Sequence, residues 1–566
     1  MKPSTLFISF GLILLLGISG KTWADFTPDT FHVFPQGFAT IQEGIDTASS
    51  TNTDGTIIYL EKGTYFLTEP IRIKQLKQPL VLVCNDPLGA TISGGRKISG
   101  FTEIEEGLVA ADIPDVKEGK WDFRDLYVND RRATRARTPN SGFFRIEKSG
   151  EDRRTNFIYN EGDLKKWKDL ENVELVFIHD WSITRCPVKE INESERRLTV
   201  PSRIGCDIDF FKIDGWEPHP RYFVENSIEF FDAPGEWFLD SKAGKLFYRL
   251  KEGETADSIE VIAPLLTQLF VVEGTASQAV CDISIGGIRF AHAAYHPKPE
   301  NTVWETQAAA FMVPGGEGGS QFLPSPAAVH FEFASGVSVN NCRFEHLGEN
   351  GLWFAKGCAD CTVSQSQFRD IGANGMMIGS HNHSDTVKNC TVHRSLVEKA
   401  GETLFGAVGI WVGITQNTDI CDSIIRELPY TGISLGWQWN PAPTPARENK
   451  IRNNVIYNCM QTLSDGGGIY TLGFQPESML VGNVIHGIPQ AAGRAESNGM
   501  FLDEGTKDFV IEKNVIFGTE QSPLRFHQAG KNIVRDNILL NKEGVPMIRY
   551  NSTPEENIQL IENRND

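Results

Sequence analysis

A short pattern of hydrophobic and polar residues returns along the C-terminal half of the chain. Each copy begins with a large aliphatic residue and reaches, three positions later, a Cys, Ser or Asn. The copies begin at Val339, Val363, Val387, Ile420, Ile451, Leu480, Ile511, Val534 and Leu560, and a related segment begins at Ile285. A period of roughly 20–35 residues with short β-type runs is typical of a solenoid built from strands.

The fourth position of this repeat becomes Asn in the last copies. These residues are Asn454, Asn483, Asn514, Asn537 and Asn563. An isolated buried amide is costly, whereas stacked amides can hydrogen-bond along the stack. We therefore expect an asparagine ladder at one interior corner, with the Cys and Ser of earlier copies as packing residues.

A second series of strands begins at glycines, each followed by an aliphatic residue. They are Gly351, Gly375, Gly409, Gly432, Gly468 and Gly499. Two strand series that each return once per coil predict parallel stacking, and the Leu-x-x-Leu-x-Leu signature of a leucine-rich horseshoe is absent. The predicted fold is all-β: a right-handed parallel β-helix, a pectate-lyase-like solenoid with an inserted β-domain.

The domain organisation follows from where this repeat pattern starts and stops. Residues 25–101 are expected to hold an N-terminal cap, with an amphipathic stretch from Phe38 to Ala48, and the first coils. Between 102 and 261 hairpin-like segments replace the coils, which predicts the inserted β-domain. Residues 262–566 form the main β-helix with the catalytic face.

Residues 1–24 have the features of a secretory signal, namely Lys2, an apolar run from Leu6 to Ile18 and a small-residue cleavage site ending at Ala24. The alternative, a membrane anchor, is disfavoured because the run is short for a bilayer. We expect a secreted or periplasmic protein, a monomer with no membrane association after cleavage.

Charge and cysteine content narrow the possible partners. The chain has 54 basic and 73 acidic residues, a net charge of −19, which disfavours nucleic acid, anionic membranes and strongly polyanionic substrates. Its 10 cysteines include one CxxC, Cys358 and Cys361, without a second pair to complete a zinc site. We expect buried or singly paired thiols, and neither metal nor cofactor. Four arginines between 131 and 137 are expected to pair with the chain's own acids rather than bind an anion.

Two residues after each marker glycine stands a side chain of the opposite strand face. These side chains are Trp353, Met377, Trp411, Ser434, Tyr470 and Phe501. They form either an outward aromatic strip that binds the apolar face of a sugar, or a second small core beneath loops. Trp437 and Trp439 favour the binding interpretation, which makes Trp411, Trp437, Tyr470 and Phe501 candidate substrate-binding residues.

Carboxylates gather near the end of this strip. Asp465 precedes a Gly-rich strand, and Asp503 and Glu504 follow the strand of the next coil. A pair of carboxyl groups supplies the proton donor and the nucleophile or base of glycoside hydrolysis. On a flat strand Asp465 and Asp503 would be over about 20 Å apart, so they can face each other only if the chain bends sharply between them, and the Gly466–Gly468 run permits such a bend.

Two neighbouring residues bear on this assignment. Glu496 is in register with Asp465 one coil away and forms a competing stacked pair. His527 takes the position of Asp503 one coil later, where it orients that acid or binds substrate.

Several motifs together resemble glycoside hydrolase family 141. They are WDFRDLYVN at 121–129, RARTPN at 135–140, GISLGW at 432–437, SDGGGIYTLG at 464–473 and LDEG at 502–505. Known activities of that family include α-L-fucosidase and xylanase. The resemblance implies that Asp465 and Asp503 are the two catalytic aspartates.

The leading hypothesis is an exported glycosidase that cleaves a cell-wall-type polysaccharide or its side chains, fucosidase- or xylanase-like. One alternative is a polysaccharide lyase, which needs a basic residue near a calcium site; Arg525 and His527 are the nearest candidates. The other is a non-catalytic carbohydrate-binding solenoid. The sugar, the linkage, exo or endo action and the anomeric outcome stay open.

Overall fold

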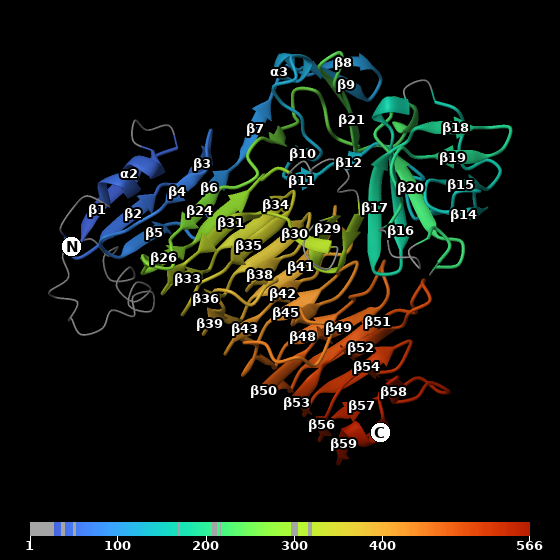
Figure 1. The fold of residues 1–566 in the computed structure, drawn as a ribbon. Coiled ribbons are helices and arrows are strands. Elements are labelled where there is room, and N and C mark those ends of the chain that lie inside the picture. The colour runs from blue at the N-terminus through green and yellow to red at the C-terminus, as the bar shows by residue number, and fades with distance from the viewer. Residues whose placement is uncertain are drawn as a thin grey trace.

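The computed structural model describes residues 28–35, 40–48, 53–167, 170–205, 212–215, 217–295, 304–314 and 320–565. The expected signal at 1–24 lies outside these residues. Within them, none of the helices has the length and apolar character needed to cross a bilayer. Figure 1 shows coils stacked from the N-terminal end, in blue, to the C-terminal end, in red, with an inserted domain, in cyan and green, beside the stack.

Three parallel sheets form the stack, one more than the two strand series in the sequence. Sheet 1 consists of β1 (Asp29–Val33), β2 (Thr56–Leu60), β5 (Leu80–Cys84), β26 (Ile283–Gly286), β33 (Ser338–Asn340), β36 (Thr362–Ser364), β40 (Thr391–His393), β44 (Asp419–Cys421), β47 (Lys450–Arg452), β50 (Phe474–Val481), β53 (Lys507–Glu512), β56 (Asn532–Arg535) and β59 (Ile558–Ile561). Sheet 2 consists of β3 (Gly63–Phe66), β6 (Ala90–Ser93), β27 (Ile288–Ala291), β34 (Arg343–Leu347), β37 (Gln367–Ile371), β41 (Leu396–Ala400), β45 (Ile424–Arg426), β48 (Val455–Tyr457), β51 (Val484–Ile488), β54 (Val515–Thr519) and β57 (Ile538–Leu539).

Sheet 3 includes the strands that contain or directly follow the marker glycines. It consists of β4 (Ile71–Ile73), β24 (Phe270–Glu273), β31 (Ala327–Glu332), β35 (Asn350–Phe354), β38 (Met376–Ile378), β42 (Ile410–Val412), β46 (Ile433–Leu435), β49 (Gly466–Thr471), β52 (Ser497–Leu502), β55 (Leu524–His527) and β58 (Ile548–Asn551). Helix α2 (Ile41–Ala48) packs against β1, β2 and β4 at the N-terminal end. The parallel β-helix with an inserted β-domain is therefore confirmed.

One repeat alignment from the sequence is wrong. Strand β39 (Val387–Lys388) lies outside sheet 1 and pairs with β43 (Thr415–Gln416) in a small separate sheet. Val392 takes the expected place of Val387, because it pairs with Val363 on one side and Ile420 on the other. Both segments begin with Val and end in a small polar or thiol residue, so the pattern alone did not separate them.

The asparagine ladder forms as expected. The Asn514 side chain donates to the Leu480 carbonyl and to Oδ1 of Asn537, at 2.9 Å each, while its own Oδ1 accepts from the backbone and side chain of Asn483. Earlier coils continue the column with serine hydroxyls at Ser366, Ser395 and Ser423. Each buried amide thus satisfies groups in both neighbouring coils, which fixes their register.

The inserted domain is built mainly from antiparallel strands. One five-stranded sheet contains β8 (Thr102–Glu105), β9 (Leu108–Asp112), β12 (Thr134–Arg135), β21 (Glu236–Asp240) and β22 (Lys245–Arg249). Strands β7 (Gly95–Ile98), β10 (Tyr127–Val128), β11 (Arg131–Arg132) and β23 (Val261–Pro264) connect it to the stack, and α3 (Pro114–Lys117) follows β9. The predicted hairpin around Gly244 is the β21–β22 pair.

The second sheet of the insertion is completed by a distant segment. It contains β13 (Arg137–Thr138), β14 (Phe144–Ser149), β15 (Asn156–Tyr159), β16 (Glu174–His179), β17 (Ser182–Pro187), β18 (Glu190–Asn192), β19 (Arg197–Thr199) and β20 (Arg221–Glu225). Strands β28 (Trp304–Thr306), β29 (Ala310–Pro314) and β30 (Ser320–Pro324) leave the β-helix and extend this sheet beyond β17. Sequence analysis did not predict this connection.

Ion pairs hold the insertion against the stack. Arg132 pairs with Asp125 and, at 2.6 Å, with Asp370 of β37. Arg135 pairs with Glu225 at 3.0 Å within the insertion. The structure thus gives Arg132 and Arg135 acidic partners from the chain itself, as expected, whereas the Arg137 side chain donates to the carbonyls of Pro139 and Gly142.

The nine cysteines that the structure describes are all unpaired thiols. Eight of them are buried, including Cys358 and Cys361 of the CxxC, which hydrogen-bond to backbone carbonyls. The packing interpretation therefore holds for these residues.

Removing one rung of the ladder tests its contribution to stability. We expect Asn514→Ala to lower the free energy of unfolding by about 2–4 kcal/mol, because it leaves buried polar groups in two neighbouring coils unsatisfied. Urea unfolding followed by circular dichroism measures the change. The matched control is Asn160→Ala, which removes one exposed hydrogen bond to the Arg145 carbonyl. Equal effects of the two substitutions would contradict a structural role for the ladder.

Candidate active site

Asp503 lies immediately after β52 in a fully hydrogen-bonded environment. Its Oδ2 accepts from the Tyr470 hydroxyl at 2.5 Å, and its Oδ1 contacts Nδ1 of His527 at 2.7 Å. The hydrogen bond to Asp503 raises the pKa of His527. Both oxygens therefore have hydrogen-bond partners, which fixes the orientation of the carboxyl group.

Asp465 forms the turn into β49, with a positive φ of 60°. The Tyr430 hydroxyl donates to its carbonyl at 2.8 Å, and Nη1 of Arg525 donates to its Oδ1 at 2.9 Å. Arg525 lies on sheet 3, two coils beyond Asp465. Its hydrogen bond therefore holds the Asp465 carboxyl group over the outer face of that sheet.

The structure brings Asp465 and Asp503 into one site. Burial raises the pKa of Asp465, the negative charge of Asp503 raises it further, and Arg525 opposes both effects. Burial raises the pKa of the Tyr430 hydroxyl, and the charges of both aspartates add to this effect. Asp465 bonds to Arg525 and Asp503 to Tyr470, and these two partners stand in one outer column of sheet 3, so the two carboxyl groups lie at the same end of the strip.

The bend does not arise as the glycine run suggested. Gly466, Gly467 and Gly468 form regular strand, and a Cβ at Gly466 would lie 2.5 Å from the Thr431 hydroxyl. A Cβ at Gly467 would meet the Asn498 carbonyl of the next coil at 2.8 Å. These glycines permit close approach of neighbouring coils, and Asp465 itself supplies the turn.

Sequence analysis missed Asp180, which comes from the inserted domain. It lies in the turn between β16 and β17, fully buried, and its Oδ1 accepts from the Ser464 hydroxyl at 2.8 Å and from the Arg494 amide at 3.0 Å. Burial raises the pKa of Asp180 to about 6, and the charge of Asp465 contributes. The insertion thus packs a third carboxyl group directly behind Asp465; no local motif marks it.

Glu496 and Glu504 take peripheral positions. Glu496 pairs with Arg549 at 2.8 Å, so Asp465 and Glu496 each have an arginine partner. Glu504 accepts from the Gln528 side chain at 3.3 Å, and burial raises its pKa.

Asp503, Glu504 and His527 offer donor atoms within 4.8 Å of one another. A metal would have to displace the hydrogen bonds that already join Asp503 to Tyr470 and His527. The hydrogen bonds of Asp503 therefore fit a closed polar cluster better than an open set of metal ligands.

The aromatic strip is not exposed, which corrects the sugar-binding interpretation. Trp411 is fully buried and stacks on His381 with ring centroids 4.4 Å apart. Trp437 is buried beside it, and Tyr470 and Phe501 are buried in a small cluster beneath Trp439. The structure therefore contains the alternative, a second core under loops. Tyr470 donates a hydrogen bond to Asp503 rather than facing a sugar.

Comparisons with known proteins agree with this architecture. Residues 107–251 match the GH141 insertion domain, and residues 319–436 and 382–564 match the right-handed β-helix region. These matches confirm the resemblance to glycoside hydrolase family 141 in the inserted domain and the handedness of the fold. The class is therefore a right-handed β-helix protein that carries a GH141 insertion domain.

Solved structures show the same fold. A protein described as a glycoside hydrolase superposes with a TM-score of 0.78 at 23% identity, covering 90% of this chain and 96% of that chain. A structure described as XylC with xylose superposes with a TM-score of 0.51 at 11% identity, covering 91% and 76%. No match was found among curated proteins.

The raised pKa of Asp180 predicts a pH-dependent penalty on folding. A native pKa of about 6, above the ordinary value near 3.9, means that the folded state holds the proton more tightly. The free energy of unfolding should fall as pH rises from about 4 to 6 and stay low above that.

Asp180→Asn abolishes this titration. We expect the variant to gain about 2–3 kcal/mol relative to the unmodified protein between pH 4 and pH 7, as measured by urea unfolding at each pH. Asp257→Asn, at an exposed position, is the control and should show no such trend. A stability difference for Asp180→Asn that does not change with pH would contradict the assignment.

Proposed function

We propose that this protein is a glycoside hydrolase that uses Asp465 and Asp503 to cleave glycosidic bonds in a cell-wall-type polysaccharide or its side chains. The observation that carries the proposal is the placement of these two carboxyl groups from different coils, because Asp465 bonds to Arg525 and Asp503 to Tyr470 of the same outer column of sheet 3. Paired carboxyl groups in different environments are the basic requirement of glycoside hydrolysis.

The two environments suggest two roles. Asp465, whose pKa is raised by burial and by its neighbour, suits the acid that protonates the leaving oxygen. Asp503, oriented by Tyr470 and His527, suits the group that attacks the anomeric carbon or activates water. His527 and Tyr470 then act as positioning residues, because they orient the Asp503 carboxyl group.

The comparisons support the class of reaction. The GH141 insertion domain occurs here together with the β-helix, and a glycoside hydrolase of the same fold covers nearly all of the chain. A fucosidase- or xylanase-like specificity is part of the proposal, and the likeness to a xylose complex is consistent with a sugar ligand.

Two observations disfavour the alternatives. A lyase base must accept a proton, yet Arg525 is paired with Asp465, and the pKa of His527 is raised by Asp503. A binding solenoid would present its aromatic rings to solvent, yet Trp411, Tyr470 and Phe501 are buried.

Replacement of either aspartate tests the proposal. We expect Asp465→Asn and Asp503→Asn each to lower kcat by roughly 10²–10⁴-fold on aryl glycosides and cell-wall oligosaccharides, because each loses its proton-transfer or nucleophilic role. Asn at 465 also tolerates the positive φ of that turn. Initial rates across a substrate panel provide the measurement.

The matched control is Asp536→Asn, an exposed residue with a φ of 56°, which should retain full activity. Undiminished activity in both active-site variants would overturn the proposal. Unsaturated products that absorb ultraviolet light would replace it with the lyase.

The proposal includes export of a monomer after removal of residues 1–24. Mass spectrometry of the secreted protein should find a mature N-terminus near Asp25. An uncleaved chain in the membrane fraction would contradict this part of the proposal.

A further inference from the structure

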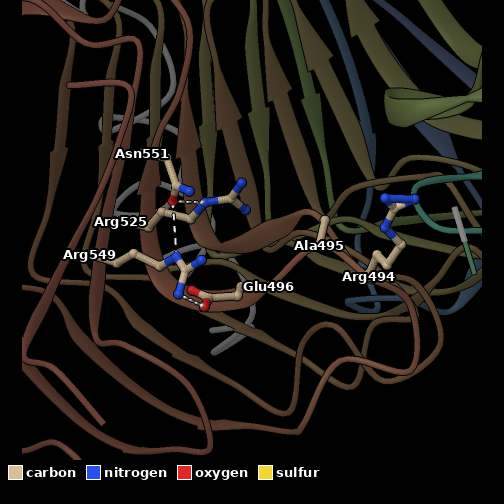
Figure 2. A pocket seen from close by; sticks show the side chains of 6 residues that line it. All are labelled: Arg494, Ala495, Glu496, Arg525, Arg549 and Asn551. Carbon is tan, nitrogen blue, oxygen red and sulfur yellow. Dashed lines mark hydrogen bonds and ion pairs between the residues drawn. The ribbon is translucent and has the colours of Figure 1, made fainter. Parts of the chain in front are cut away.

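A pocket of about 200 Å³ adjoins Asp465 at the C-terminal end of sheet 3. Arg494, Ala495, Glu496, Arg525, Arg549 and Asn551 line it. Figure 2 shows Glu496, Arg525, Arg549 and Asn551 grouped on one side, with Arg494 opposite. The volume lies below the roughly 300–1,000 Å³ of pockets for drug-sized ligands, so it suits a single sugar unit rather than a length of chain.

Two of these arginines stand in one column. Arg525 pairs in register with Phe501 on one side and with Arg549 on the other, so the outer column of sheet 3 changes from aromatic rings to guanidinium groups at this point. Like charges directly opposite on neighbouring strands destabilise a sheet. An anion between or beside the two side chains would relieve this repulsion.

Few hydrogen bonds hold the pair. Oδ1 of Asn551 accepts from Nε of Arg525 at 3.2 Å and from Nε of Arg549 at 3.1 Å. Arg525 uses Nη1 for Asp465, and its Nη2 makes no hydrogen bond with the residues that the structure describes. A single amide oxygen thus orients both guanidinium groups while donors remain for a ligand.

Charge in the lining favours an anion. Three guanidinium groups line the pocket with one carboxylate, Glu496, which pairs with Arg549 at 2.8 Å, and Arg525 also pairs with Asp465 outside the lining. This positive site lies in a chain of net charge −19, which repels a long polyanion but not one charged unit held by arginines.

The position of the pocket fixes its relation to catalysis. Arg525 lines the pocket and also donates to Asp465 at 2.9 Å, so a ligand there lies beside the proposed acid. A sugar bound in this pocket therefore lies next to the glycosidic bond that is cleaved.

We propose that this pocket is a subsite for one acidic sugar, a residue that carries a carboxylate or a sulfate ester. The proposal rests on the glycosidase function for its place in a substrate, but the binding of an acidic monosaccharide does not require catalysis. The expected substrate is a mainly neutral glycan with a single anionic residue next to the scissile bond.

Binding to the unmodified full chain tests the subsite. Ligand-observed NMR titration with D-galacturonate, D-glucuronate and D-galactose 6-sulfate is compared with D-galactose and D-glucose. We expect the acidic sugars to bind at least ten-fold more tightly and to weaken as NaCl rises from 0.05 to 0.5 M. Tighter binding of the sulfate than of both uronates identifies a sulfate ester, and the reverse identifies a carboxylate.

Variants locate the binding in this pocket. Arg549→Gln should weaken acidic sugars at least ten-fold, and Arg549→Lys should give an intermediate loss because the planar fork is absent. Glu496→Gln should tighten them at least three-fold, a gain that a misfolded variant would not produce. The matched control is Arg447→Gln, an exposed arginine next to Glu448, which should leave binding unchanged.

Equal binding of neutral and acidic sugars, no binding of either, or equal losses in Arg549→Gln and Arg447→Gln would overturn the subsite. These outcomes are separate from the failure of the glycosidase proposal. If the glycosidase proposal failed, Asp465→Asn and Asp503→Asn would keep full activity. The unmodified protein would still bind acidic sugars more tightly than neutral ones.

Discussion

Register between coils is the constraint on which this structure depends. Asp465, Asp503 and His527 are placed by the parallel pairing of one coil with the next, and a slip of one residue would exchange the interior and exterior faces of a strand. The ladder from Ser366 to Asn563 opposes such a slip, because each amide or hydroxyl bonds to the coil beside it. The geometry of the active site therefore depends on this interior ladder.

Much of the fold could be predicted because a solenoid repeats its local rules. The amides of Asn454 and Asn483 recur at the same corner, and the marker glycines recur at the start of one strand series. Prediction failed at Val387, because Val392, five residues later, begins a segment of similar pattern and takes the place in sheet 1. A periodic pattern identifies a coil but cannot decide which of two adjacent, similar segments forms its strand.

The candidate site was only partly accessible from sequence. Asp503 and His527 were predicted as neighbours because they occupy the same column in consecutive coils, and the structure places their side chains 2.7 Å apart. Asp180 was not, since its contact with Ser464 joins residues 284 positions apart and depends on how the insertion packs. The aromatic column was located correctly, but its exposure was not, because loops from other coils cover it.

The insertion has a further consequence for how the chain reaches its native state. Its larger sheet is extended by β28–β30, and its β16–β17 turn meets residues near 465 and 494. During synthesis from the N-terminus, the inserted domain therefore cannot complete its contacts until β28–β30 and the residues near 465 and 494 have been synthesised. Such long-range contacts slow folding and leave strand edges open to aggregation until the last coils arrive.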